Sequence, residues 1–234
     1  MAKLPDTLRI YAIGDIHGRA DLLEVLFDKI AIAERERPKA RSHMVFLGDY
    51  IDRGPDSHGV IELLLHGLPA GLAGDFLLGN HEQMMLDALA DEDALGLWIA
   101  NGGAVALQSY ARAARASGDR REEWVALREL VPPEHLDFLE RLQFYVEYGG
   151  YCFTHAGLRP GVPLDRQDPH DLVWIRKPFL DHKGSFGRVV VHGHTPVPSP
   201  EVHPNRIAID TGAVFTDRLT ALVLEGERQE FIQT

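Results

Sequence analysis

The sequence lacks the features that define several classes of protein. It has one cysteine, Cys152, in 234 residues, so no disulfide can form within the chain. Lys and Arg number 24 against 35 Asp and Glu, and the formal net charge of −11 argues against nucleic acid or an anionic membrane as the main partner. No apolar run reaches the ~18–20 residues of a membrane helix, and residues 1–6 lack the apolar core of a signal peptide. These absences predict a cytoplasmic protein.

What is present is the composition of an ordinary globular domain. Hydrophobic residues make up 45% of the chain and charged residues 25%. We expect one domain over residues 1–234, because this length suits a single large domain. Cys152 lies in an apolar run without a downstream Cys-x5-Arg loop, which predicts a buried core thiol and not a nucleophile.

Apolar runs alternate with a helical pattern over the first ~80 residues. The expected strands are Leu8–Ile13, His43–Leu47 and Phe76–Leu78. Helices are expected over Ala20–Arg37 and Ser57–His66, the second with Ser57 as its N-cap. This β-α-β-α-β order predicts parallel strands with right-handed crossovers, whose ligand site lies beyond the carboxyl ends of the strands.

The character of the chain changes after the third strand. Residues 82–140 have a helical pattern with breaks at 101–103, 117–118 and 132–133, which predicts a helical insertion beside the site. Extended segments then return. They are expected at Phe144–Tyr148, Tyr151–Thr154, Arg188–Val191, Arg206–Asp210 and Thr220–Leu224. The first two flank Gly149-Gly150 and predict a hairpin.

Five short clusters of glycine, aspartate, asparagine and histidine follow the predicted strands. They lie at 14–18, 48–54, 79–82, 154–157 and 192–196. Each cluster alone is typical of an ordinary turn, but five of them at successive strand ends have no common structural explanation. Carboxylate, amide and imidazole ligands suit Mn²⁺, Fe or Zn²⁺ and are poor for Cu(I). The set is large enough for two ions, which then need a bridging aspartate.

Together these clusters resemble the calcineurin-like metallophosphoesterases, and within them the phosphoprotein phosphatase family in its bacterial and phage-type branch. The resemblance rests on Gly-Asp-x-His-Gly at 14–18, Gly-Asp-x-x-Asp-Arg-Gly at 48–54 and Gly-Asn-His-Glu at 79–82, and it extends to Thr211. It implies an α/β fold with two mixed β-sheets flanked by helices in a four-layer sandwich. It also implies two divalent metal ions, with Mn favoured and Fe or Zn as alternatives.

The resemblance also implies metal ligands. Asp15 and His17 would hold the first ion, and Asp49 would bridge to the second. The remaining ligands of the second ion would be Asn80, His155 and His194. The family pattern favours His194 over the neighbouring His192, which is expected to have a structural role.

Other residues would act on the substrate. His81 would donate a proton to the leaving oxygen, oriented by Asp52, and Arg53 would bind the phosphate. The second phosphate-binding arginine is expected at Arg176. The weaker alternatives are Arg19 and Arg188. The sequence departs from the family at two positions, with Leu78 where many relatives have arginine and Ala156 where they have glycine.

The implied activity is hydrolysis of phosphomonoesters, foremost on phosphoserine and phosphothreonine proteins, by direct attack of a hydroxide that bridges the two ions. The first alternative is hydrolysis of dinucleoside polyphosphates such as diadenosine tetraphosphate on the same fold. Bacterial enzymes that cleave symmetrical dinucleoside polyphosphates typically have Gln where His17 stands, so His17 favours the phosphatase. An inactive binding module and a nuclease or phosphodiesterase are further alternatives. The expected partner is a phosphorylated protein or a small phosphoester, and the sequence leaves the oligomeric state open.

Overall fold

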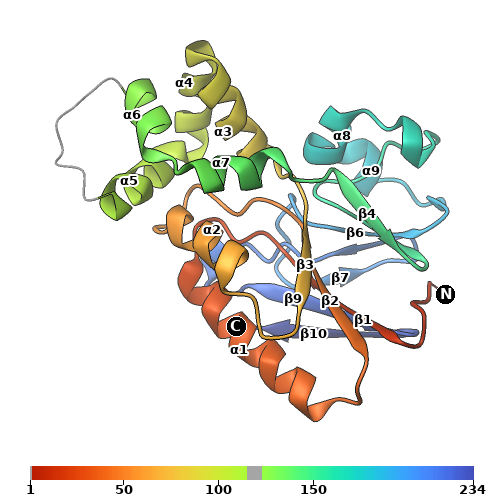
Figure 1. Ribbon diagram of the computed structural model, residues 1–234. Coiled ribbons are helices and arrows are strands. Elements are labelled where there is room, and N and C mark those ends of the chain that lie inside the picture. Colours follow the sequence, from red (N-terminus) through yellow and green to blue (C-terminus); the bar gives the residue numbers. More distant parts are fainter. Residues whose placement is uncertain (1, 115–122) are drawn as a thin grey trace.

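Two mixed β-sheets form the centre of the molecule. The computed structural model describes residues 2–114 and 123–234. In the described residues the first sheet has the order β10-β9-β1-β2-β3 and the second the order β4-β5-β6-β8-β7 (Figure 1). The strands of the first sheet are β1 Leu8–Ile13, β2 Arg41–Phe46, β3 Ala73–Phe76, β9 Thr220–Glu225 and β10 Arg228–Gln233. Those of the second are β4 Tyr145–Tyr148, β5 Tyr151–Thr154, β6 Val189–His192, β7 Glu201–Val202 and β8 Arg206–Ala208.

Helices cover the outer side of the sheets (Figure 1). The helices within 80–113 and 123–140 form a separate region above the first sheet, called here the helical region. The helices in chain order are α1 Ala20–Glu36, α2 Ser57–His66, α3 Asn80–Ala90, α4 Leu95–Trp98, α5 Ala104–Ala113, α6 Glu123–Leu130, α7 Pro133–Glu140, α8 Pro169–Trp174, α9 Lys177–Leu180 and α10 Ala213–Thr216. Short 3-10 turns lie at Glu92–Ala94 and Leu164–Arg166, and a π-helical turn at Ile99–Gly103. The α/β sandwich predicted from the sequence is confirmed, with five strands in each sheet.

Strand β1 is buried on both faces and joins the layers. Its alternate residues Ile10 and Ala12 pack between the two sheets, whereas Tyr11 and Ile13 pack on the other side against α1. This follows from the two-residue period of side chains along a strand. Strands β1, β2 and β3 pair in parallel, as the β-α-β-α-β order predicted, so their carboxyl ends meet at one edge.

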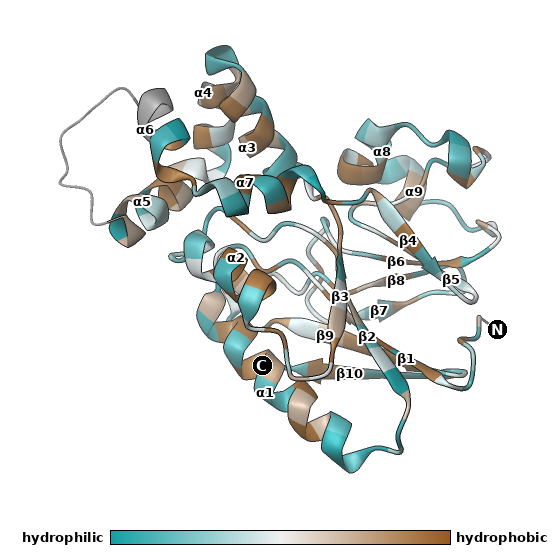
Figure 2. Ribbon diagram, viewed as in Figure 1, coloured by the Kyte–Doolittle hydropathy of each residue, from teal (hydrophilic) through white to brown (hydrophobic). Residues whose placement is uncertain are grey.

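Helix α1 attaches to the first sheet through one apolar stripe. Its buried side chains recur at three- and four-residue spacing, and Figure 2 shows hydrophobic and hydrophilic segments alternating along the helix. These side chains are Leu22, Leu23, Leu26, Phe27 and Ile30. Burial of each contributes about 1.5–3 kcal/mol, so tertiary packing and not helix propensity fixes this element.

Several predicted elements need correction. The third strand is Ala73–Phe76 and not Phe76–Leu78, because its pairing with β2 begins at Ala73 and Leu77 makes only an isolated bridge to Gln143. Helix α2 is capped by Asp56, whose side chain accepts a hydrogen bond from the Gly59 N–H. Ser57 is the first helical residue, and its Oγ accepts a hydrogen bond from the backbone N–H of Asp52.

Helices α3 to α7 occupy the segment in which the helical insertion was expected. The predicted break at 101–103 is the π-helical turn, where Gly102 has φ of 115°, and the break at 132–133 is the start of α7. The break at 117–118 lies outside the described residues. In the part of the chain that the structure describes, no helix is both long and apolar enough to cross a membrane.

Candidate metal centre

Six predicted metal ligands lie together at the carboxyl ends of the strands. Asp15 follows β1, Asp49 follows β2 and His155 follows β5. The full set, called here the strand-end cluster, is Asp15, His17, Asp49, Asn80, His155 and His194. No member is more than 5% exposed. Both sheets therefore contribute ligands to one buried site.

The loops that carry the cluster have an unusual backbone. Six non-glycine residues among the described ones have φ between 46° and 72°, and three of them are His17, Asp49 and His194 of the cluster. Two more, Asp52 and Arg53, lie in the loop after β2. Each such residue costs on the order of 1–3 kcal/mol, and residues of this kind concentrate at functional sites.

Glycine lets these loops approach one another. A Cβ added to Gly193 would lie 2.0 Å from Oδ1 of Asp15, and one added to Gly79 would lie 2.3 Å from the backbone nitrogen of Asp49. Neither contact is possible for a real side chain. The glycines of the motifs are therefore required by the convergence of the loops, and not only by turn conformation.

Asp49 lies between two groups of ligands. Its Oδ2 is 3.4 Å from Nε2 of His17, and its Oδ1 is 3.3 Å from Nε2 of His155. The donor atoms of His17, Asp49 and His81 lie within 4.8 Å of one another, as do those of Asp49, His155 and His194. A carboxylate with one oxygen toward each group is the arrangement that two neighbouring cations need.

Hydrogen bonds fix the position of the proton on two imidazoles of the cluster. Nδ1 of His17 is 2.9 Å from the Ile51 carbonyl, and Nδ1 of His155 is 2.8 Å from the Leu47 carbonyl. A carbonyl can only accept, so Nδ1 carries the proton in both rings. Burial lowers the pKa of both histidines to about 3, so each is neutral and its Nε2 carries a lone pair and no proton.

The donor set fits a bound cation. The free lone pair of His155 Nε2 faces two acceptors, Oδ1 of Asn80 at 3.0 Å and Oδ1 of Asp49 at 3.3 Å, with no proton between them. Burial, together with the nearby Asp210, also raises the pKa of Asp49 to about 7. A cation among these atoms would satisfy the lone pairs and neutralise the buried carboxylates, so the residues present fit divalent metal ions.

His81 and Asp52 form a buried pair beside the cluster. Nδ1 of His81 is 2.7 Å from Oδ2 of Asp52, and its Nε2 is buried without a hydrogen-bond partner. The ring lies edge-on to His17, with ring centroids 4.7 Å apart. The unpartnered Nε2 is therefore the atom of this pair that is available to a substrate.

Trp98 holds this pair from the helical region, and the sequence did not predict it. Its Nε1–H lies 3.0 Å from each carboxylate oxygen of Asp52. The backbone N–H of Asp52 donates to Oγ of Ser57, which is the task of that residue in place of capping. The Arg53 N–H donates to the Gly102 carbonyl at 3.3 Å, so the helical region contacts both residues of the loop.

Two arginines reach the cluster from opposite sides. Arg53 donates to Nε2 of His17 at 2.7 Å, and Arg176 donates to Nε2 of His194 at 3.2 Å. Both arginines are exposed, so their guanidinium groups lie where the buried ligands meet the surface. This is the position that an anionic substrate would occupy.

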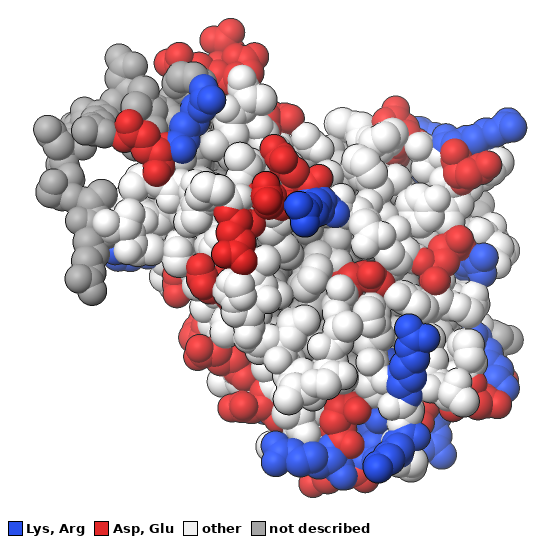
Figure 3. Space-filling model, viewed as in Figure 1, with Lys and Arg blue, Asp and Glu red and all other residues white. Residues whose placement is uncertain are grey.

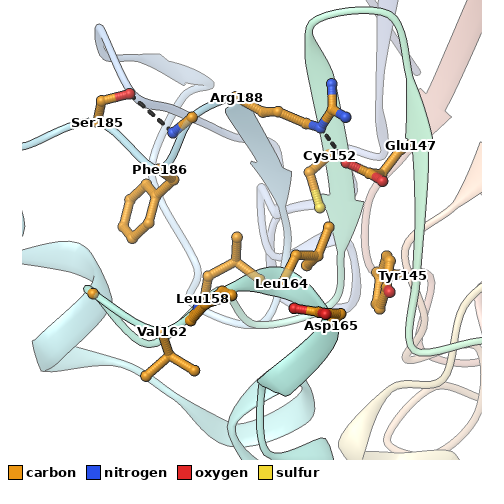
Figure 4. Close-up of a pocket in the computed structure, with 13 residues that line it drawn as sticks. Tyr145, Glu147, Cys152, Leu158, Val162, Leu164, Asp165, Ser185, Phe186 and Arg188 are labelled. Atoms are coloured by element: carbon orange, nitrogen blue, oxygen red, sulfur yellow. Dashed lines mark hydrogen bonds and ion pairs between the residues drawn. The ribbon is translucent and has the colours of Figure 1, made fainter.

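The other two candidate arginines lie elsewhere. Arg19 binds Asp21 and Asp217. Arg188 pairs with Glu147 at a cavity of about 670 Å³ beside β4 and β5 (Figure 4). None of the ten predicted site residues lines this cavity. Cys152 lines it and is 1% exposed, and burial raises its pKa to about 12, so the predicted buried thiol is confirmed.

Two further acidic residues belong to the site and were not among the site residues predicted from the sequence. Glu82 accepts hydrogen bonds from the backbone nitrogens of Asp49, Tyr50, Ile51 and Gly79, at 2.8–3.2 Å. Asp210 accepts from the Gly212 N–H and, after burial, is the largest cause of the raised pKa of Asp15. Glu82 in the Gly-Asn-His-Glu motif was the available signal, because a carboxylate at the third position of a helix caps its first turn.

His192 lies beside the cluster without joining either group of ligands. Its ring packs edge-on against Phe179, with centroids 4.9 Å apart, and its Nδ1 is 3.0 Å from the Gly193 carbonyl. This placement agrees with the structural role expected for it.

Comparison with known proteins places the chain in a family. The model of the family described as calcineurin-like phosphoesterase matches residues 8–221. The chain therefore belongs to the calcineurin-like phosphoesterases, whose reaction is the hydrolysis of phosphoesters.

Two relatives and one solved structure show which kinds of phosphoesterase the chain is similar to. The chain is 29% identical to serine/threonine-protein phosphatase 1 of Salmonella typhimurium, over 90% of this chain and 89% of that protein. It is 28% identical to an asymmetrical bis(5'-nucleosyl)-tetraphosphatase of Oceanobacillus iheyensis, over 96% and 95%. A crystal structure described as a candidate diadenosine tetraphosphatase superposes with a TM-score of 0.66 at 23% identity, covering 100% of this chain and 98% of the other. The last likeness confirms the fold.

Proposed function

We propose that the chain is a metal-dependent phosphomonoesterase that acts on phosphoserine and phosphothreonine proteins. The observation that carries this proposal is the Asp49 carboxylate, with one oxygen toward His17 and the other toward His155, next to the His81–Asp52 pair. We assign Asp15 and His17 to one ion, with Asp49 as the bridge, and Mn²⁺ as the preferred metal. The other ion takes Asn80, His155 and His194. In this proposal residues 1–234 form one domain, with 82–140 as an insertion.

The ions, when bound, supply the positive charge that makes hydroxide available near neutral pH and that neutralises phosphate oxygens. Arg53 and Arg176 bind the remaining phosphate oxygens, since a planar guanidinium matches them in geometry and charge. Because the net charge is −11 and acidic side chains lie over the helical region in Figure 3, these local groups and not the overall field select an anionic substrate.

His81 protonates the leaving oxygen through Nε2. Burial and the neighbouring His17 lower its pKa, whereas burial raises the pKa of Asp52, so the free pair favours its uncharged forms. A phosphate dianion held by Arg53 adds negative charge beside the ring. We therefore expect the proton to reside on His81 when substrate is bound, where a poor alkoxide leaving group requires it.

A second candidate substrate is a dinucleoside polyphosphate such as diadenosine tetraphosphate. The names of the relatives support both substrate classes. His17, in the position where enzymes that cleave symmetrical dinucleoside polyphosphates typically have Gln, favours the phosphoprotein over that kind of substrate cleavage. The single buried cysteine favours a cytoplasmic location for this reaction.

The test is one competition experiment followed by ³¹P NMR. The Mn²⁺-loaded protein receives a phosphothreonine peptide and diadenosine tetraphosphate in the same tube, with the Asp49→Asn variant as the control for contaminating activity. We expect inorganic phosphate to accumulate while the tetraphosphate persists. Release of ADP, or of ATP and AMP, while the peptide stays phosphorylated would assign the dinucleotide instead. Turnover by the variant equal to that of the wild type would show that the activity does not depend on Asp49 and would overturn the proposed centre.

A further inference from the structure

A second cluster of histidine and carboxylate side chains lies outside the strand-end cluster. It consists of His58 and Glu62, one turn apart on α2, and His135 on α7. Their donor atoms lie within 4.8 Å of one another. These residues, called here the helical cluster, belong to none of the five motifs of the sequence.

Both imidazoles face the same carboxylate oxygen. Nε2 of His135 is 2.9 Å from Oε1 of Glu62, and Nε2 of His58 is 3.9 Å from it. Ligands around a tetrahedral Zn²⁺ with bonds of 2.0–2.1 Å are roughly 3.3 Å apart, a value between the two distances. The side chain of Glu62 is 47% exposed and that of His58 23%, so both can adjust by rotation about their own bonds.

The chemistry of the three side chains selects the kind of ion. Two imidazoles and one carboxylate are a poor set for Mg²⁺ or Ca²⁺, which prefer oxygen ligands only. The same set with one open position is common at zinc. His135 also has the outer partner that a ligating imidazole usually has, because its Nδ1 is 3.0 Å from Oη of Tyr110.

We propose that His58, Glu62 and His135 bind one zinc ion, with water as its fourth ligand. Nδ1–H of His135 then donates to Tyr110, and its Nε2 is free to coordinate. His135 is 1% exposed and its burial disfavours the charged imidazolium, so the ring is neutral. Without the ion its proton lies on Nε2, which donates to Glu62, and it moves to Nδ1 when zinc binds. This site is independent of the metal centre proposed for hydrolysis.

Zinc at this position would join two parts of the molecule. Helix α2 begins directly after the loop that carries Asp52, and its Ser57 accepts from the Asp52 N–H. Helix α7 belongs to the helical region that supplies Trp98. The ion would therefore fix the helical region against α2 and hold the contacts of Asp52 from both sides.

The test compares the zinc content of matched variants of the full chain. His58→Gln and Glu62→Gln alter exposed or partly exposed ligands, so the fold is retained. His66→Gln is the control, since His66 lies on the same face of α2 and pairs with Glu134 at 3.4 Å. Each protein is equilibrated with excess Mn²⁺ and Zn²⁺, desalted, and analysed for total metal by mass spectrometry.

We expect His58→Gln and Glu62→Gln to bind one metal equivalent less than the wild type, and His66→Gln to bind the same amount. The readout is the difference between proteins, so it does not depend on how many ions the strand-end cluster holds. Equal metal content in all four proteins, or the same loss in His66→Gln, would overturn the proposal and leave an ordinary His–Glu ion pair.

Affinity and thermal stability provide a second readout. Tyr110→Phe keeps all three ligands and removes only the outer partner, so we expect its zinc affinity to fall by about 10-fold or more. Zinc at 100 times its Kd should raise the Tm of the wild type by about 5–10 °C more than that of Glu62→Gln. An equal rise in both proteins would contradict binding at the helical cluster.

Discussion

The two histidine–carboxylate clusters of this molecule are built in opposite ways. The strand-end cluster lies on loops, is almost completely buried, and forces three of its residues to positive φ. The helical cluster lies on two regular helices, and its Glu62 is half-exposed. In the first, unprotonated imidazole nitrogens face acceptor oxygens, whereas in the second His135 already binds Glu62 directly.

This difference shows what each cluster requires. The strand-end cluster has buried carboxylates and lone pairs that only a cation can satisfy together, so the cost of assembling it is offset by binding. The helical cluster is satisfied without an ion, and zinc would have to displace an existing hydrogen bond. We therefore expect metal dependence of activity at the first and metal-dependent stability at the second.

The largest expected effect is that of Asp49→Asn. The amide keeps the size of the side chain but removes the charge shared by both groups of ligands. We expect kcat/KM to fall by about 10³-fold or more and bound Mn²⁺ to be lost.

The matched control for that variant is Asp75→Asn. Asp75 also faces a histidine, with Oδ2 at 3.0 Å from Nε2 of His43, but it lies on β3 outside the cluster. We expect its activity and metal content to stay within twofold of the wild type. A similar loss in both variants would mean that the strand-end cluster is not special among the Asp–His pairs of the protein.

His81→Ala separates proton transfer from metal binding. Removal of the acid should lower kcat by about 10²–10⁴-fold, while metal content stays unchanged because His81 is not assigned as a ligand. A substrate with a good leaving group, such as 4-nitrophenyl phosphate, should lose less activity than a phosphothreonine peptide. Loss of metal from this variant would instead make His81 a metal ligand.

Glu82→Gln tests how strongly the loops depend on one buried carboxylate. Glu82 accepts four backbone hydrogen bonds, and an amide would present donors to backbone donors. We expect the free energy of unfolding in urea to fall by about 2–4 kcal/mol. Glu62→Gln in the helical cluster is the matched control, and measured without zinc it should change the same quantity by less than about 1 kcal/mol.

Trp98→Phe has the smallest expected effect. The ring is kept and only the N–H donated to Asp52 is removed, so metal binding and KM should not change. We expect kcat to fall by about 10-fold, the value of one hydrogen bond to a charged group. An unchanged kcat would show that Asp52 is positioned by Ser57 and His81 alone.

The parts of the fold that follow from local pattern were predicted from the sequence. Apolar runs identified β1 and β2, and three- and four-residue spacing identified α1. Strand β10 was missed because Arg228–Gln233 is polar and lies at the edge of its sheet. The start of β3 was missed because Ala73-Gly74-Asp75 has no apolar run, and only its pairing with β2 reveals it.

In the candidate site, too, some residues were predicted from local pattern and others were not. The candidate ligands could be proposed because glycine and polar residues recur at strand ends. Trp98 could not, since it lies 46 residues from Asp52 in a helical segment where a tryptophan indicates only packing. The positive φ of His17 and Asp49 could not be predicted from the sequence either, because it arises only when the loops that carry these residues come together in the fold.

The hydrogen bond from Trp98 to Asp52 links the helical region to the candidate catalytic pair. Helix α4 and the turn after it border the loop that carries Arg53, so under the proposed function a substrate that contacts them also acts on the carboxylate that would orient His81. By thermodynamic linkage, a substrate that fits the helical region improves the alignment of His81, and alignment of His81 favours that fit in equal measure. A compound that displaces α4 would then inhibit turnover allosterically, without contact with any metal ligand.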